Sequence, residues 1–156
     1  MIDYNQLPIG DRAPDVVAAV VELLCGMRVG RRFDPQTNTF SIEEHYERPV
    51  GIDYGWIAGT RNPADGAPLD VMIATDRRLH VGQVVEVVPL GVLRREDGDH
   101  KIMSSLASER TYRSMDDIPQ TLIEEIEDWL TPHHVLLGWR GADDAQALIL
   151  KCMPGA

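Results

Sequence analysis

Between residues 40 and 95 the sequence repeats one pattern, in which short apolar runs are separated by turn-forming residues. The clearest runs are "YGWIAGT" (54–60), "LDVMIAT" (69–75) and "QVVEVVPLGVLRR" (83–95), and they are bounded by Gly, Pro, Asn and Asp. Runs of this length and composition are typical of β-strands. Closely spaced short strands favour a barrel, because closure removes the exposed edges of a sheet. The centre of the chain therefore predicts a mainly β fold.

The pattern changes to helical spacing at "MDDIPQTLIEEIEDWL" (115–130). Asp116 or Asp117 can cap this helix, and Pro119 suits its first turn. A second helix is expected at "DDAQALILKCM" (143–153), whose acidic residues lie near its start. The whole chain of 156 residues fits one compact α+β domain, residues 1–156, with its own hydrophobic core.

The run "VVAAVVELL" (16–24) has no unique local interpretation. Its two alanines and one glutamate suit a helix, whereas its four valines suit a buried strand. Hydrophobic periodicity alone does not decide between them.

The charge balance limits the partners that such a chain can have. With 25 acidic and 15 basic residues and a net charge of −10, the protein repels nucleic-acid backbones and anionic membranes, and it favours cationic ligands such as divalent metals. Cys25 and Cys152 are far apart and form no CxxC motif, and no secretory segment or long apolar run follows Met1. We therefore expect a reduced, cytoplasmic setting and no membrane partner.

Two acidic segments are candidates for a metal site. The segment "NPADGAPLDVM" (62–72) contains helix-breaking Gly66 and Pro68, so it forms a loop that can direct two carboxylates at one point. The segment "REDGDHK" (95–101) follows the longest β run. Clustered carboxylates repel one another unless a cation neutralises them, and Mg²⁺ prefers such hard oxygen ligands. Solvated turns are the alternative, because Asp-Gly pairs are common in turns.

Several blocks resemble one known family in the same order along the chain. They are "DYGWI" (53–57), "DGAPLDVM" (65–72), "VGQVVEVVPLGVLRREDGDHK" (81–101) and "LLGWRGADDAQALI" (136–149). Together they resemble the soluble family I inorganic pyrophosphatases, over a span from about Gly10 to Lys151. The resemblance implies a five-stranded, OB-like β-barrel with flanking C-terminal helices and a first strand at "APDVVAAVVELL" (13–24). It also implies Mg²⁺-dependent hydrolysis of a small phosphate-containing substrate and a homo-oligomer, of which the hexamer is one form.

The same resemblance implies roles for individual residues. Asp65, Asp70 and Asp99 stand at positions for the principal metal, Asp97 at a position for a further metal, and Glu22 at the edge of the acidic cavity. Mg²⁺ is the expected cofactor and Mn²⁺ is the alternative. The candidates for catalysis are Asp65, Asp70, Lys101 and Tyr54, of which Lys101 and Tyr54 stand where the family contacts phosphate. Arg31 and Arg32 can bind a phosphate through two donors, or they can be exposed strand residues.

Some of the family's pattern is missing. Ala67 stands where the family has a third Asp, which orients and deprotonates the attacking water. The family's Lys-x-Glu has no equivalent in "MRVGRRFDPQ" (27–36), its Arg is absent from "SIEEHYERP" (41–49), and its late Tyr-Lys pair is replaced in "LTPHHVLL" (130–137). Loss of a general base alone costs about 10²–10⁴ in rate. These departures predict a weakened hydrolase.

Two other functions are compatible with the same departures. One is a catalytically inactive metal- or metabolite-binding or assembly protein. The other is a hydrolase with a larger, less charged substrate, in which Asp53, His133 or His134 takes over a lost role.

Overall fold

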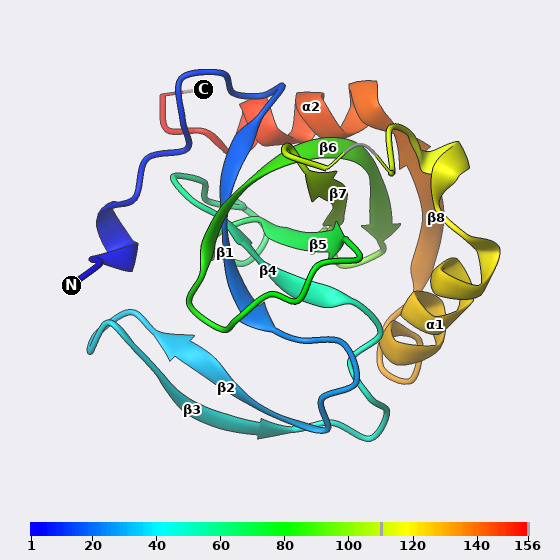
Figure 1. Ribbon diagram of the computed structural model, residues 1–156, viewed down its shortest axis with the longest axis horizontal. Helices are drawn as coiled ribbons and strands as arrows, with labels where there is room; N and C mark the ends of the chain where they lie inside the picture. The colour runs from blue at the N-terminus through cyan, green and yellow to red at the C-terminus, as the bar shows by residue number, and fades with distance from the viewer. Residues whose placement is uncertain (110, 156) are drawn as a thin grey trace.

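The computed structural model describes residues 1–109 and 111–155 (Figure 1). In chain order the elements are the 3₁₀ turn η1 (Tyr4–Gln6), strands β1 (Val17–Leu23), β2 (Val29–Asp34), β3 (Thr39–His45), β4 (Asp53–Ile57), β5 (Asp70–Ala74), β6 (Val84–Arg95) and β7 (Lys101–Leu106), the 3₁₀ turn η2 (Met115–Asp117), helix α1 (Gln120–Leu130), strand β8 (Leu136–Gly141) and helix α2 (Ala142–Cys152). None of the helices in these two ranges has the length and apolar character needed to cross a membrane.

A closed barrel forms the centre of the molecule. The strands pair in the order β1-β4-β5-β7-β6-β8, and an additional pairing of β1 with β6 closes the first five into a ring, with β8 alongside β6. Strands β5 and β7 run parallel, while the other pairs in this sheet are antiparallel. The predicted α+β, mainly β fold with a five-stranded barrel and C-terminal helices is therefore confirmed.

Strand β1 explains why the first apolar run has no local signature. It pairs with β4 along one edge and with β6 along the other, and almost all of its residues are buried. A strand that is covered on both faces needs a continuous apolar sequence. The strand implied by the family resemblance is thus confirmed. Gly55 on β4 passes so close to β1 that an added Cβ atom would lie 1.7 Å from the carbonyl oxygen of Val20.

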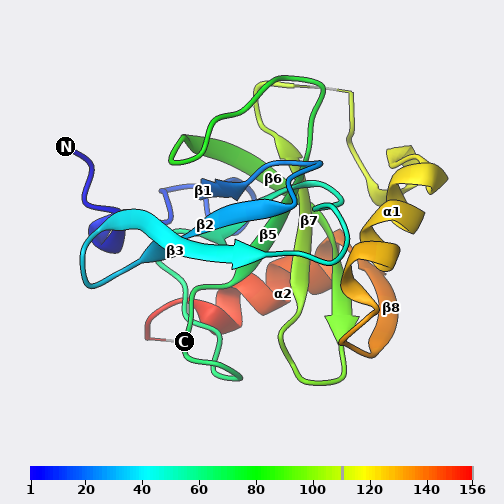
Figure 2. The same cartoon turned by 90° about the horizontal axis from the view of Figure 1, so that it is seen from below.

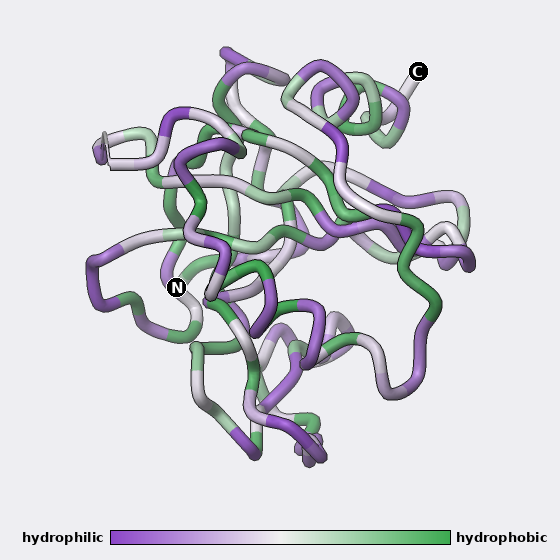
Figure 3. The backbone as a smooth tube through the Cα atoms, turned by 90° about the vertical axis from the view of Figure 1, so that its right-hand side faces the viewer, coloured by the Kyte–Doolittle hydropathy of each residue, from purple (hydrophilic) through white to green (hydrophobic). Residues whose placement is uncertain are grey.

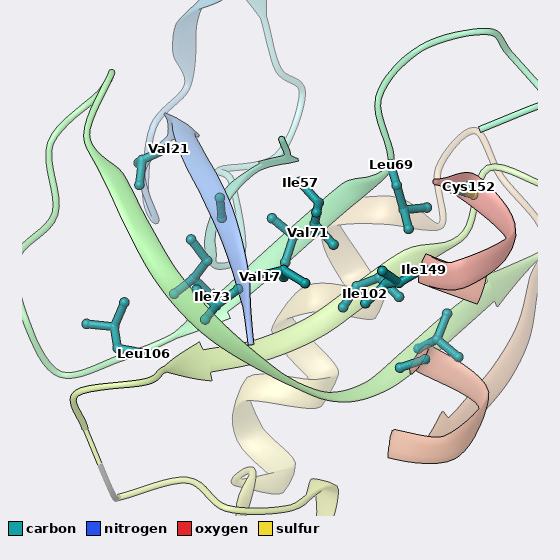
Figure 4. Close-up of a cluster of buried hydrophobic side chains, with 14 of the residues drawn as sticks. Val17, Val21, Ile57, Leu69, Val71, Ile73, Ile102, Leu106, Ile149 and Cys152 are labelled. Atoms are coloured by element: carbon teal, nitrogen blue, oxygen red, sulfur yellow. The ribbon is translucent and has the colours of Figure 1, made fainter. Parts of the chain in front are cut away.

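Two apolar clusters fill the fold. The first cluster joins the barrel to helix α2 through Ile149 and Cys152, and Figure 4 shows both residues facing Ile102 and Leu69. The second cluster joins the barrel to helix α1 through Ile126. Complete burial of one such side chain stabilises the fold by about 1.5–3 kcal/mol. In Figure 3 the hydrophobic stretches run through the barrel, and hydrophilic segments gather at its periphery.

Both C-terminal helices lie where the sequence predicts them, with one difference at the first. Asp117 accepts hydrogen bonds from the backbone N–H groups of Arg113 and Ser114, at 2.8 and 3.2 Å, and so closes the turn η2. Helix α1 begins only after Pro119, which occupies the N-cap position. The acidic pair therefore caps the turn before the helix rather than the helix itself, because the proline separates the two.

Strands β2 and β3 form a separate two-stranded sheet, here called the ribbon (29–45). Figure 1 places it on the opposite side of the barrel from α2, and Figure 2 shows it crossing one face of the molecule. An aromatic cluster holds it, since Phe33 and Phe40 contact the ring of Trp56 with centroid distances of 4.9 and 6.1 Å, and Tyr4 packs beside all three. The ribbon therefore rests on β4 through ring contacts.

Candidate active site

A polar cavity of about 550 Å³ lies where the ribbon, the loop 62–69 and the segment 130–134 approach the barrel. Its lining includes the charged side chains of Arg32, Asp70, Arg95, Asp99 and Lys101. Asp65, Ala67 and Tyr54 line it as well. The structure thus brings both acidic segments of the sequence to one cavity.

The floor of the cavity is an ion-pair cluster on adjacent strands. Asp70 and Lys101 begin β5 and β7, and they are partners in the register of this parallel pair. The Lys101 Nζ donates hydrogen bonds to Asp70 Oδ2 at 2.6 Å and to the hydroxyl of Tyr54 at 3.0 Å, and it lies 3.1 Å from Asp99 Oδ2. Lys101 is only 3% exposed. A lysine buried to this extent requires carboxylate partners, because an unpaired charge there is costly.

The pKa values of the two carboxylates in this cluster are shifted in opposite directions. Burial raises the pKa of Asp70 to about 6, the Lys101 ammonium opposes that rise, and the Asp99 carboxylate adds to it. For Asp99, burial acts to raise the pKa, but Lys101 and a hydrogen bond from Asp70 outweigh it and lower the pKa overall. Burial also raises the pKa of Tyr54 well above its usual range, so this phenol stays neutral and can act as a donor.

Arg95, which the sequence did not single out, forms a second cluster at the end of β6. Its Nε and Nη2 atoms contact the two oxygens of Asp97 at 3.2 and 2.5 Å, and Nη2 also lies 2.7 Å from His134 Nδ1. Its Nη1 atom lies 3.7 Å from Asp99 Oδ2. The side chain of Arg95 is 6% exposed, whereas that of Asp97 is 51% exposed. Asp97 is thus bound by two donors of a buried guanidinium.

On the ribbon, Arg32 is likewise paired with carboxylates. Its Nε lies 3.1 Å from Glu22 Oε1, and its Nη1 lies 3.4 Å from Glu44 Oε2. Glu22 also accepts a hydrogen bond from the backbone N–H of Phe33 at 2.7 Å. Burial acts to lower the pKa of Arg32, but Glu22 raises it above its usual value, so the guanidinium stays charged. Arg31, the predicted substrate contact, is exposed and does not line this cavity.

The loop 62–69 holds Asp65 and Ala67 near the cavity without a strong contact to the floor. Asp65 Oδ1 accepts a hydrogen bond from the backbone N–H of Ala67 at 2.9 Å, which makes an Asx turn. The buried Asn62 donates to the carbonyl oxygen of Gly98 at 3.2 Å and so ties the two acidic loops together. Ala67 presents only a methyl group to the cavity, and a methyl group can neither accept a proton nor bind a metal.

The remaining candidates are divided between this cavity and a second one. Asp53 lines another cavity of about 560 Å³, and its carboxylate accepts a hydrogen bond from the Cys25 backbone N–H at 2.9 Å. His133 lies at the rim of the first cavity, 3.4 Å from Glu47 Oε2, and is largely exposed. His134 contacts Arg95. Asp53 therefore does not join the acidic cluster.

The donor chemistry bears on the metal that the family implies. Across residues 1–109 and 111–155, no three His, Cys, Asp or Glu side chains are arranged closely enough to hold a metal ion. Asp70 and Asp99 nevertheless lie side by side against one cation, and Asp65 lines the same cavity. Their all-oxygen donor chemistry is the type that a hard divalent ion prefers. Glu22 and Asp97 are instead paired with arginines.

Comparison with known proteins identifies the same family throughout. A family model described as inorganic pyrophosphatase matches residues 19–155. The inorganic pyrophosphatase of Bradyrhizobium diazoefficiens is 30% identical over 94% of this chain and 93% of its own length, and that of Aeropyrum pernix is 28% identical over 92% of each. The crystal structure of the enzyme from Ehrlichia chaffeensis superposes with a TM-score of 0.86 at 26% identity, and covers 95% of this chain and 99% of that one. The Thermus thermophilus structure gives 0.83 at 26% identity, with 97% of each chain covered.

Proposed function

The chain belongs to the inorganic pyrophosphatase family, and from this premise we propose that it hydrolyses inorganic pyrophosphate, or a related phosphoanhydride, to phosphate with Mg²⁺. The observation that carries the proposal is the buried cluster of Lys101, Asp70, Asp99 and Tyr54 at the floor of an open cavity. A lysine held between two carboxylates under a polar cavity is suited to bind an anion together with a divalent cation.

Each member of the cluster has a role in this proposal. Asp65, Asp70 and Asp99 would hold the ion, which supplies charge neutralisation and a bound water of lowered pKa. Lys101 provides a fixed positive charge near a phosphate, where it stabilises the negative charge that develops on the leaving oxygen. Tyr54 stays protonated, so its hydroxyl can donate to a phosphate oxygen while it accepts from Lys101.

We expect the turnover to be slow because the base is missing. Ala67 has no carboxylate, and the carboxylate of Asp65 on the same loop already accepts a hydrogen bond from the Ala67 backbone N–H. Loss of a positioned general base costs about 10²–10⁴ in rate. Part of that loss is offset because a metal-bound water is already acidic. Mn²⁺ is the alternative metal in this proposal, and a cytoplasmic homo-oligomer, such as a hexamer, is the proposed form.

The test is phosphate release from pyrophosphate with Mg²⁺, for the native chain and for Asp70→Asn, Ala67→Asp and Asp11→Asn. We expect the native chain to release phosphate, Asp70→Asn to lose at least about 10²-fold of the rate, and Ala67→Asp to gain about 10-fold or more. Asp11 is exposed and does not line the cavity, so Asp11→Asn should leave the rate unchanged. Folding of each variant is checked by circular dichroism.

A second candidate is a binding or assembly protein without turnover, and the pairing of Glu22 and Asp97 with arginines favours it. In that case neither the native chain nor Ala67→Asp releases phosphate with Mg²⁺ or Mn²⁺, although both are folded. Such a result would reject the hydrolase. A hydrolase with a larger substrate predicts instead that the native chain cleaves nucleotides or polyphosphate faster than pyrophosphate.

A further inference from the structure

The carboxylates in and beside the cavity are already paired with cations of the chain itself. Arg32 contacts Glu22 and Glu44, Arg95 contacts Asp97 and Asp99, and Lys101 contacts Asp70 and Asp99. Such cations compete with any divalent ion for the same oxygens. The number of ions that the cavity takes therefore depends on which of these cations can move away.

Arg95 is the cation least able to leave. Its side chain is 6% exposed, and two of its nitrogens bind the two oxygens of Asp97 in parallel. The planar guanidinium makes such paired contacts with little loss of freedom. The Nη2 atom of Arg95 also lies 2.7 Å from His134 Nδ1. Displacement of Arg95 would leave a permanent charge buried without a partner, which is strongly unfavourable.

Lys101 behaves differently. Its ammonium is a compact charge on a flexible stem with three donors, so it can change its hydrogen-bond partners by small movements. It also has a neutral partner, since the Tyr54 hydroxyl accepts one of its hydrogen bonds. A divalent ion can therefore bind Asp70 and Asp99 while Lys101 retains a partner.

We propose that Arg95 takes the place of a second divalent ion, because its guanidinium neutralises Asp97 and the adjacent side of Asp99. The site then takes a single ion, held by Asp65, Asp70 and Asp99. This inference rests on the proposed function in one respect, since both require that the cavity binds a divalent cation. It differs because it concerns the number of ions and not turnover.

The experiment counts Mn²⁺ ions bound per chain, by the electron paramagnetic resonance signal of free Mn²⁺ and by calorimetry, in the absence of substrate. We expect the native chain to bind one ion and Arg95→Met to bind two. Arg94→Met is the matched control, since Arg94 is the exposed neighbour on the same strand and the variant loses the same charge. The Arg94→Met variant should bind one ion, like the native chain. Arg95→Lys should take a second ion more weakly than Arg95→Met.

A second pair of variants makes the assignment specific to Asp97. In the native background Asp97→Asn should leave the count and affinity of Mn²⁺ unchanged, because Asp97 is already bound by Arg95. In the Arg95→Met background the same change should return the count from two to one. The measurement of Asp97→Asn in the native background does not depend on whether Arg95→Met folds. A weaker Mn²⁺ affinity of that single variant would contradict the proposal.

Several outcomes overturn the inference. They are a native chain that binds two or more ions, a folded Arg95→Met that still binds one, and a native chain that binds none. These are separable from failure of the proposed function, because a count of one without phosphate release supports the role of Arg95 and rejects only the hydrolase.

Discussion

The two walls of the cavity are held in different ways. On the barrel wall, Tyr54, Asp70 and Lys101 lie on β4, β5 and β7, which are neighbours in one continuous sheet. On the ribbon wall, Arg32 and Glu44 lie on strands that form their own two-stranded sheet. Asp65 and Ala67 belong to neither wall, because they lie on the loop 62–69 between them. Side chains on the barrel wall are therefore fixed by a closed sheet, whereas those on the ribbon wall are not.

The side chains of the two walls also differ in burial. The side chain of Lys101 is 4% exposed, whereas those of Arg32 and Glu44 are 30% and 46% exposed. Loss of one partner in the Lys101 cluster leaves a charge unpaired and away from water. Loss of one partner on the exposed part of the ribbon leaves a charge that solvent can screen. We therefore expect substitutions on the barrel wall to cost more stability than those on the ribbon wall.

The largest expected effect comes from Gly55→Ala in the barrel wall. The new methyl group would lie 1.7 Å from the Val20 carbonyl oxygen, so β1 and β4 could not pair. We expect loss of folded protein, measured by circular dichroism and by size-exclusion chromatography. Gly66→Ala in the loop is the control, because its Cβ meets open space and only its φ of +73° opposes it, at a cost of about 1–2 kcal/mol. Equal stability of the two variants would contradict the close packing of β4 against β1.

The next effect compares the loss of one cation from each wall. Lys101→Met leaves Asp70 and Asp99 without their shared cation, and we expect it to lower the free energy of unfolding by about 3 kcal/mol. Arg32→Met removes the same charge from a side chain that is 30% exposed, and the buried Glu22 keeps its hydrogen bond from the Phe33 backbone N–H, so we expect a smaller loss of about 1–2 kcal/mol. Urea denaturation measures both. The comparison fails if Arg32→Met proves the more damaging.

The smallest effect is local to the ribbon. Phe40 contacts Phe33 and Tyr4 with centroid distances of 5.3 and 5.2 Å, and Phe40→Ala removes these contacts. We expect amide hydrogen exchange to rise in residues 29–45 by about 10-fold, because local opening there becomes easier by about 1–1.5 kcal/mol. Exchange in β5 and β7 should stay unchanged. A uniform rise across the chain would mean that the ribbon and the barrel open as one unit.

Much of the fold could be predicted from the sequence. The apolar runs at 54–60, 69–75 and 83–95 correspond to β4, β5 and β6, because buried strands need apolar residues and turns need Gly, Pro and Asp. The ribbon gave no comparable signal. Nearly all residues of β3 are exposed, so no alternation of apolar and polar residues marks it. Its strands are specified by pairing and by the aromatic cluster, which are contacts distant in sequence.

The site could be predicted only in part. The acidic loops and Lys101 were recognisable as motifs, but the burial of Arg32 and Arg95 was not. Each follows another arginine, and in both pairs the first is exposed and the second lines the cavity. Successive residues of a strand face opposite sides, so one of each pair must turn inward. Which one does so depends on register, and a single sequence does not fix the register.

The parallel pairing of β5 with β7 has a consequence for how the protein folds. These strands cannot pair until the chain between them, which includes all of β6, has folded back across the barrel. Contacts between distant parts of a chain form slowly, since loop closure must precede them. Asp70 and Lys101 face one another only in the correct register, and a shift by one residue would turn one of them to the other face. We therefore expect the charged centre of the cavity to form only in chains in which the segment between β5 and β7 has already folded back.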